Sequence, residues 1–227
     1  MNDLVYLGLD TASHDVTVGA VRGAQCVHTQ LELGETSTHL LTAVGELLER
    51  LRAKPSDLGA VACAAGPGSF TGIRIGLATA LGLTEGLDLP AAAVSNHWAQ
   101  AWAAQRSGAS GAICSLLPSH GGQWSLQRYV LERGLRTESA IETVAEPPTA
   151  ETLVTSQGAC RRFLKETEHR SAWLAPLATS LAFLASTADS EDTPLNWDRS
   201  SLLQPVYAAG PAVATSPRVP ASAPASE

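Results

Sequence analysis

The strongest local pattern in the chain is a turn-rich loop that leads directly into an apolar segment ending near Gly86: Gly66-Pro67-Gly68-Ser69-Phe70-Thr71-Gly72. The run Gly59 to Ala65 before it is apolar without alternation, which predicts a strand buried on both faces. A glycine-rich loop between a strand and a helix favours an anion site, because the first helical turn leaves N–H groups unpaired. The loop has neither the Gly-Lys-Ser/Thr of a P-loop nor the dinucleotide-binding spacing. A compact strand-to-helix connection is therefore the simpler interpretation.

The segments around this unit predict an α/β domain in which an antiparallel meander precedes parallel crossovers. Three short strands come first: Leu4 to Leu9, Val16 to Val21 and Gln25 to Leu33. Behind the N-cap candidates Thr36 to Thr38, apolar residues recur at helical spacing as far as Leu51. A helix from Thr71 to Gly86, a strand from Ala91 to Ser95 and a helix from Asn96 to Arg106 follow. The order βββαβαβα is typical of a ribonuclease H-like layered domain.

A short Gly/Ser-rich break at Ser107 to Gly111 predicts the main division of the chain. We expect an N-terminal ribonuclease H-like subdomain over residues 1–107 and a C-terminal degenerate subdomain over 108–208. The second half predicts strands at 112–117, 124–131 and 152–155, helices at 159–166 and 179–186, and a late strand at 202–208. Residues 209–227 are rich in Pro, Ala and Ser without periodicity, which predicts a disordered tail.

The amino-acid composition argues against two classes of function, nucleic-acid binding by this chain alone and metal binding. The 227 residues are 44% apolar, enough for a substantial core, and carry a formal net charge of −7. Such an acidic chain is a poor lone binder of nucleic acid, because phosphate contacts need clustered Lys and Arg. The six histidines and four cysteines contain no Cys-x-x-Cys or His-x-x-x-His pair, so no metal site is expected. No signal peptide or membrane span is recognisable, which predicts a cytoplasmic protein without membrane contact.

Asp10 is the one acidic residue for which two roles have to be weighed. It ends the first predicted strand, just before Thr11-Ala12-Ser13. In sugar-kinase and actin-like folds an acidic residue at this place helps to hold a metal–nucleotide complex. The alternative function is therefore a small-molecule phosphotransferase that uses Asp10 and the Gly66–Gly72 loop. The glycine usual in that turn is absent, and capping of its own turn is the simpler role for Asp10.

The segment from Gly66 to Leu83 closely resembles the hallmark segment of the TsaB (YeaZ) family. Four flanking segments resemble that family as well: Leu7-Gly-Leu-Asp-Thr11, Thr38-His-Leu-Leu41, Gly86-Leu-Asp-Leu-Pro90 and Gln204-Pro-Val-Tyr207. The resemblance is close over residues 4–105 and loose over 112–208. Leu117 to Ser125 departs from the family's Asp-Ala-Arg-x-x-Glu-Val-Tyr pattern, so no function is assigned to that loop.

The resemblance implies an actin/Hsp70/sugar-kinase-like fold of two related halves, the second degenerate. It also implies a part in making threonylcarbamoyladenosine, the modification beside the anticodon of tRNAs that read codons beginning with A. In that family the transferase chemistry belongs to TsaD, so this chain is expected to be a non-catalytic scaffold or activator. The implied partners are a TsaD-like catalytic subunit and a TsaE-like ATPase, with tRNA reached only through the complex. No cofactor is expected on this chain alone, and ATP only at the level of the complex.

The resemblance places the partner interface on the two helices that flank the strand at 59–65. Gly72, Gly76 and Ala80 recur every four residues, which predicts a face that another helix can approach closely. The residues expected to contact the partner are Leu40, Leu41, Val44, Leu47, Leu48, Leu51, Ile73, Arg74, Leu77 and Leu81. A homodimer through the same helices is the remaining hypothesis.

Overall fold

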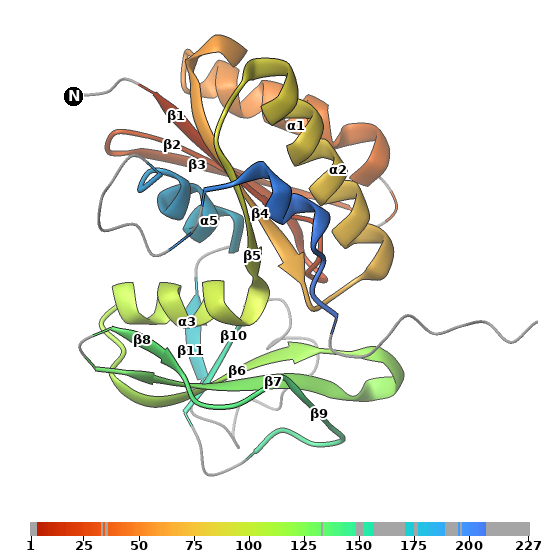
Figure 1. Cartoon of the computed structure of the whole chain (residues 1–227), viewed down its shortest axis with the longest axis vertical. Coiled ribbons are helices and arrows are strands. Elements are labelled where there is room, and N and C mark those ends of the chain that lie inside the picture. The colour runs from red at the N-terminus through yellow and green to blue at the C-terminus, as the bar shows by residue number, and fades with distance from the viewer. Residues whose placement is uncertain are drawn as a thin grey trace, which may run out of the picture.

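The computed structural model describes residues 4–207 except 33, 35, 133, 149–151, 157–170, 175–176, 189–194 and 196. Two β-sheets, each with helices packed against it, make up the architecture (Figure 1). Within the described residues, no helix combines the length and the apolar character needed to cross a membrane.

The first sheet has the strand order β3-β2-β1-β4-β5. Its strands are β1 (Val5–Asp10), β2 (Val16–Arg22), β3 (Gln25–Leu31), β4 (Leu58–Gly66) and β5 (Ala91–Ser95). The pairs β1–β2 and β2–β3 are antiparallel, whereas β1–β4 and β4–β5 are parallel. The predicted meander followed by parallel crossovers is thus confirmed. The inner strand β4, between β1 and β5, is almost wholly buried, as its uninterrupted apolar run predicts.

Three helices cover the two faces of the first sheet. Helices α1 (Thr36–Arg50) and α2 (Phe70–Leu87) lie side by side on one face, and α5 (Leu177–Ala185) packs against β1 and β2 on the other (Figure 1). Glycines in the strands let α5 come close: a Cβ on Gly8 would lie 2.0 Å from the carbonyl oxygen of Ala178, and one on Gly19 would lie 2.8 Å from it. Side chains alternate along a strand, so Leu7 and Leu9 point to the α1–α2 face instead.

The second sheet has the order β11-β10-β6-β7-β8, and β9 also pairs with β7. Its strands are β6 (Gly111–Pro118), β7 (Trp124–Leu131), β8 (Leu135–Thr137), β9 (Glu142–Val144), β10 (Leu153–Ser156) and β11 (Ser171–Leu174). Helix α3 (Asn96–Arg106) packs on this sheet and also contacts β4, β5 and α5 of the first layer. Short 3-10 helices lie at η1 (Pro55–Asp57), η2 (His120–Gly122) and η3 (Arg199–Leu203).

The two halves of the sequence exchange elements. Helix α5 and η3 come from the second half but pack on the first sheet, while α3 comes from the first half and packs on the second. The boundary at 107/108 stays a prediction: each range contains all the strands of its own sheet, but α5, η3 and α3 pack on the sheet of the other range.

Three sequence predictions need comment. The late strand at 202–208 is wrong, because η3 forms there with Asp198 as its N-cap, and Val206 donates a single backbone hydrogen bond to Ala65. The short strands β8, β9 and β11 were not predicted. The helix at 159–166 and the tail at 209–227 lie outside the described residues.

Candidate functional site

The predicted loop Gly66–Gly72 packs tightly against the turn between β1 and β2. The N–H of Ser69 donates to the carbonyl oxygen of Ala12 at 2.8 Å, and Thr11 Oγ1 donates to the carbonyl oxygen of Gly72 at 2.7 Å. A Cβ on Gly68 would lie 2.1 Å from the oxygen of Ala12, and one on Gly72 would lie 1.9 Å from the oxygen of Thr11. These glycines therefore permit two backbone segments of the same chain to touch.

The other side of the loop is covered by the segment that follows η3. The N–H of Val206 donates to the oxygen of Ala65 at 2.8 Å, and a Cβ on Gly66 would lie 2.3 Å from the oxygen of Val206. Gly66 also has φ +101°, which favours glycine. The first turn of α2 is capped internally, because Ser69 Oγ accepts from the N–H of Gly72 at 3.1 Å. Backbone groups of the chain thus occupy the space that the glycines leave for a phosphate.

Asp10 is buried in the turn beside this loop. Its Oδ1 accepts from the N–H groups of Ala12 at 3.2 Å and Ser13 at 3.0 Å, which confirms the predicted turn cap. Burial raises the pKa of the Asp10 carboxyl to about 6, against the opposing effect of hydrogen bonds from Ser13, Ala12 and Asn96. Within the described part of the chain, no three His, Cys, Asp or Glu side chains are grouped so as to hold a metal ion.

Asn96, which the sequence did not single out, ties the turn, the loop and α3 together. Its Nδ2 donates to Asp10 Oδ1 at 3.5 Å and to Ser13 Oγ at 3.2 Å, and its Oδ1 accepts from the N–H of Gly66 at 2.9 Å. The only sequence signal was the position of Asn96 directly after β5. Asp10 and Asn96 together fix the backbone at the ends of β1 and β4, next to the start of α3.

A second buried polar cluster lies between α3 and the second sheet. His97 Nδ1 is 2.9 Å from Ser115 Oγ, and His97 Nε2 is 2.8 Å from Ser125 Oγ. Ser115 donates its hydroxyl hydrogen to Gln100 Oε1 at 2.7 Å, so Nδ1 of His97 carries the proton and Nε2 accepts from Ser125. Burial lowers the pKa of His97 to about 3, which keeps the ring neutral. The serines and the histidine are all buried, so the cluster fixes α3 on the sheet and leaves no access for a substrate.

Most of the predicted partner-contact residues lie in the core of this chain, so their assignment is corrected. The buried residues, each at most 5% exposed, are Leu40, Val44, Leu47, Leu48, Leu51, Ile73 and Leu77. The reason is that an amphipathic pattern marks the face a helix lays on its own sheet just as well as a face laid on a partner. Leu41 is 60% exposed, Arg74 is exposed and Leu81 is half-buried, so these three remain on the surface.

The predicted close-approach face of α2 is also used internally. A Cβ on Gly76 would lie 2.1 Å from Thr11 Oγ1 and 3.2 Å from Cys63 Sγ, and Ala80 is fully buried. The opposite face of the helix carries another set of small residues, Ala78, Gly82 and Gly86, and all three are exposed. A Cβ on Gly82 or Gly86 would meet no atom within 4 Å. We call this outer face of α2 the small-residue face.

Neighbouring elements border the small-residue face on both sides. Helix α1 contacts α2 on one flank, and η3 contacts both α2 and β5 on the other (Figure 1). Each neighbour contributes a large exposed apolar side chain, Leu41 on α1 and Leu203 at the end of η3, the latter 68% exposed. Gly45, one helical turn beyond Leu41, again has open space where a Cβ would lie. The result is a surface with small residues on its central helix and a large exposed apolar side chain on each flank, and the exposed Glu85 of α2 lies on the same face.

An arginine and two aromatic rings stand at the N-terminal end of this surface. The guanidinium carbon of Arg74 lies 3.9 Å from the centroid of the Phe70 ring. The rings of Phe70 and Tyr207 have centroids 5.4 Å apart and planes inclined by 31°. Away from this surface, Trp98 and Trp102 of α3 form a stacked pair with ring centroids 6.5 Å apart.

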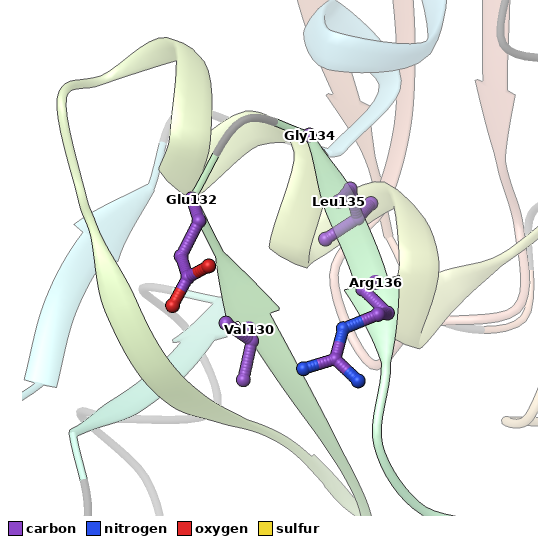
Figure 2. A pocket seen from close by; sticks show the side chains of 5 residues that line it. All are labelled: Val130, Glu132, Gly134, Leu135 and Arg136. Carbon is purple, nitrogen blue, oxygen red and sulfur yellow. The ribbon is translucent and has the colours of Figure 1, made fainter.

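A shallow hollow of about 250 Å³ lies on the β7–β8 hairpin, far from these features in the sequence. Figure 2 shows its lining of Val130, Glu132, Gly134, Leu135 and Arg136. Arg136 pairs with Glu138 at 2.7 Å, so its charge is already engaged. The lining offers no nucleophile with a base, and we do not assign it a function.

Comparison with known proteins finds matches whose names concern threonylcarbamoyladenosine in tRNA. Residues 35–119 match the family model described as TsaD, tRNA N6-adenosine threonylcarbamoyltransferase. The chain is 35% identical over 105 residues to tRNA threonylcarbamoyladenosine biosynthesis protein TsaB of Haemophilus influenzae, which is 46% of this chain and 44% of that protein. It is 30% identical to the Escherichia coli protein of the same name, over 62% of each chain. The matches thus span less than two thirds of these relatives.

Solved structures agree with the sequence relatives in fold. YeaZ from Pseudomonas aeruginosa superposes with a TM-score of 0.67 at 21% identity, over 90% of this chain and 99% of that one. A second structure, of a protein with similarity to peptidase YeaZ from Pseudomonas aeruginosa, gives 0.67 at 23% identity, over 91% and 100%. The resemblance to the TsaB (YeaZ) family is therefore confirmed, and the chain shares the two-sheet α/β fold of these YeaZ structures.

Proposed function

We propose that this chain is a non-catalytic subunit of the system that makes threonylcarbamoyladenosine in tRNA, and that it binds a TsaD-like catalytic subunit through the small-residue face of α2. The relatives named TsaB and the match to the TsaD family model support the process and the partner. Because the matches cover less than two thirds of those relatives, they suggest only the process and the partner. The residues of the proposed interface come from the exposed surface of α2 described above.

The observation that carries the proposal is the open space over Gly82 and Gly86. A glycine in a helix interior is about 1 kcal/mol less favourable than an alanine. The packing of the described residues needs a glycine at neither position, because a Cβ would meet none of their atoms within 4 Å. Small residues on an exposed helix do permit a second helix to pack at short interaxial distance. The exposed Leu41 and Leu203 on either side would be buried by such a helix.

The buried titratable groups support a binding role over a chemical one. Asp10 holds its own turn and contacts Asn96, and His97 is shared between two serines. Both groups are buried and already hydrogen-bonded inside the chain. Neither therefore has a free atom directed at a substrate.

The phosphotransferase alternative lacks a comparable observation. Its proposed cradle contains Gly66 and Gly68, where the oxygens of Val206 and Ala12 already lie. It predicts magnesium-dependent binding of ATP by the isolated chain, which calorimetry at millimolar ATP would measure.

The homodimer hypothesis uses the same surface as the main proposal, and sedimentation with and without the TsaD-like subunit separates the two. Two further expectations stay predictions: that a TsaE-like ATPase is a second partner, and that ATP binds at the level of the complex.

The variant Gly82→Gln tests the proposal because it should weaken binding to the partner without destabilising the fold. Glutamine is the better helix former, so the free energy of unfolding should stay equal or rise by up to about 1 kcal/mol. The longer side chain would hold a second helix away, so the Kd for the TsaD-like subunit of the same organism should rise at least about tenfold. Calorimetric titration and thermal unfolding measure the two quantities.

The matched control is Thr137→Gln, which places the same side chain on an exposed position of β8 in the second sheet. Its affinity for the TsaD-like subunit should equal that of the wild type. If Gly82→Gln binds as tightly as Thr137→Gln, the small-residue face is not the interface.

A further inference from the structure

Arg74 carries a positive charge that no acidic residue in the described part of the chain pairs with. Its side chain is exposed on α2, and it forms no ion pair with any described residue. The residue lies in the second turn of α2, near the helix N-terminus. Its recorded contact within the described residues is with the ring of Phe70.

The guanidinium group is nevertheless held in one place. It lies over Phe70 at 3.9 Å from the ring centroid, and Phe70 is in turn packed against Tyr207. The backbone next to Tyr207 is fixed by the hydrogen bond from Val206 to Ala65. A guanidinium stacked on a ring keeps the N–H groups along its edge available to an acceptor. Because the side chain is already ordered, less conformational entropy is lost when an acceptor binds.

Arg74 belongs to the same exposed face as the small residues. Ala78 lies one helical turn further along α2, and Leu81 lies one turn beyond that. The cation thus marks the N-terminal end of the surface proposed for the partner helix. Arg199 on η3 lies at the C-terminal end of α2, where it pairs with Glu85 and Asp88.

We propose that Arg74 receives a carboxylate of the TsaD-like subunit in a two-bond ion pair, and that this pair fixes how the partner helix lies along α2. The planar fork of an arginine matches both oxygens of a carboxylate. A tRNA phosphate is a weaker fit, because binding to a phosphate backbone needs several cations together and Arg74 stands alone on this surface. The proposal rests on the proposed function and adds the residue that orients the partner.

The test compares Arg74→Gln, Arg74→Lys and the control Arg136→Gln, an exposed arginine on β8. Each protein is titrated with the wild-type TsaD-like subunit at several NaCl concentrations. Arg74→Gln should raise the Kd about tenfold or more at low salt and make it less dependent on salt. Arg74→Lys should restore the salt dependence but only part of the affinity, because an ammonium cannot form the two parallel bonds. Arg136→Gln should match the wild type, and all variants should keep the wild-type Tm.

Two results overturn the assignment in distinguishable ways. If wild-type protein binds and Arg74→Gln binds within twofold with the same salt dependence, the ion pair does not exist and the proposed interface stands. If wild-type protein does not bind the TsaD-like subunit at all, the proposed function is wrong and the assignment fails with it. Full recovery of affinity by Arg74→Lys would replace the two-bond pair with a simple charge attraction.

Discussion

The two faces of α2 carry small residues at the same spacing and use them differently. On the inner face, Gly72 and Gly76 leave room for the carbonyl oxygen and side chain of Thr11. On the outer face, Gly82 and Gly86 have open space above them. The inner glycines are thus required by the fold of this chain. The outer ones are unexplained by it, and that difference directs attention to a partner on the outside.

The contrast also teaches why glycine spacing alone is ambiguous. A Gly-x-x-x-Gly pattern indicates that another segment packs closely on the helix, but it does not identify that segment. In α2 the close neighbour of the first pair is a turn of the same chain, at Thr11 near the N-terminus. Only the space around each missing Cβ separates an internal contact from an external one.

The largest expected effect comes from filling the inner face. Gly72→Ala should lower the free energy of unfolding by about 3 kcal/mol or more, because the new methyl group would lie 1.9 Å from a backbone oxygen that cannot move freely. Urea denaturation measures the change. A loss below about 1 kcal/mol would mean that the β1–β2 turn can retreat from α2, and the distinction between the two faces would then weaken.

A second prediction concerns the turn that presses on the inner face. Burial raises the folded-state pKa of Asp10 from 3.8 to about 6, so the folded state prefers the protonated carboxyl. Its stabilising contribution is present below about pH 4 and is lost as the pH rises through about 6. Asp10→Asn keeps the acceptor for Ala12 and Ser13 and removes the charge. At pH 7 the free energy of unfolding should rise by on the order of 2 to 3 kcal/mol.

The pH dependence of the stability gain in Asp10→Asn checks whether the buried charge of Asp10 is its cause. The gain over wild type should shrink as the pH falls from about 7 to about 4, because wild-type Asp10 becomes protonated in the fold. His97 titrates in an overlapping range with the opposite sign, but it is common to both proteins and cancels in the difference. A gain that is constant from about pH 4 to about pH 7 would assign the effect to something other than the buried charge.

The smallest expected effect comes from filling the outer face with a methyl group. Gly82→Ala should raise the free energy of unfolding by up to about 1 kcal/mol, because alanine is the better helix former and nothing lies above it. Thermal unfolding of the isolated chain measures it. Destabilisation by this variant would show that the outer face is already covered within the chain, contrary to its open space.

Much of the fold follows from periodicity and burial. The apolar run of β4 and the helical spacing from Leu40 to Leu51 each mark one element, and a residue's neighbours in sequence suffice to recognise it. Strands β8 and β9 have three residues each, too few for a pattern. The segment at 202–208 is apolar enough for a strand, but the cap at Asp198 and its bonds to Ser200 start a 3-10 helix instead.

The site was less predictable, because exposure is not a property of local sequence. Leu41 and Leu47 are both leucines of one amphipathic helix, yet the first is 60% exposed and the second fully buried. Their difference depends on where the sheet lies beneath α1. Asn96 and Leu203 gained their positions from contacts with segments far away in the chain, so no spacing pattern marked them. The segment from Gly66 to Leu83 was the exception, because the resemblance to the TsaB family identified it directly.

The packing of α5 on the first sheet has a consequence for synthesis. When β1 and β2 leave the ribosome, the face that contains Gly8 and Gly19 has nothing to cover it until residues 177–185 have been translated. Val206, which closes the loop at Gly66, comes later still. The earliest sheet of the nascent chain is therefore among the last to be completed. During that interval its bare face is a surface for chaperones to protect, and a polypeptide interrupted before α5 would carry it unprotected.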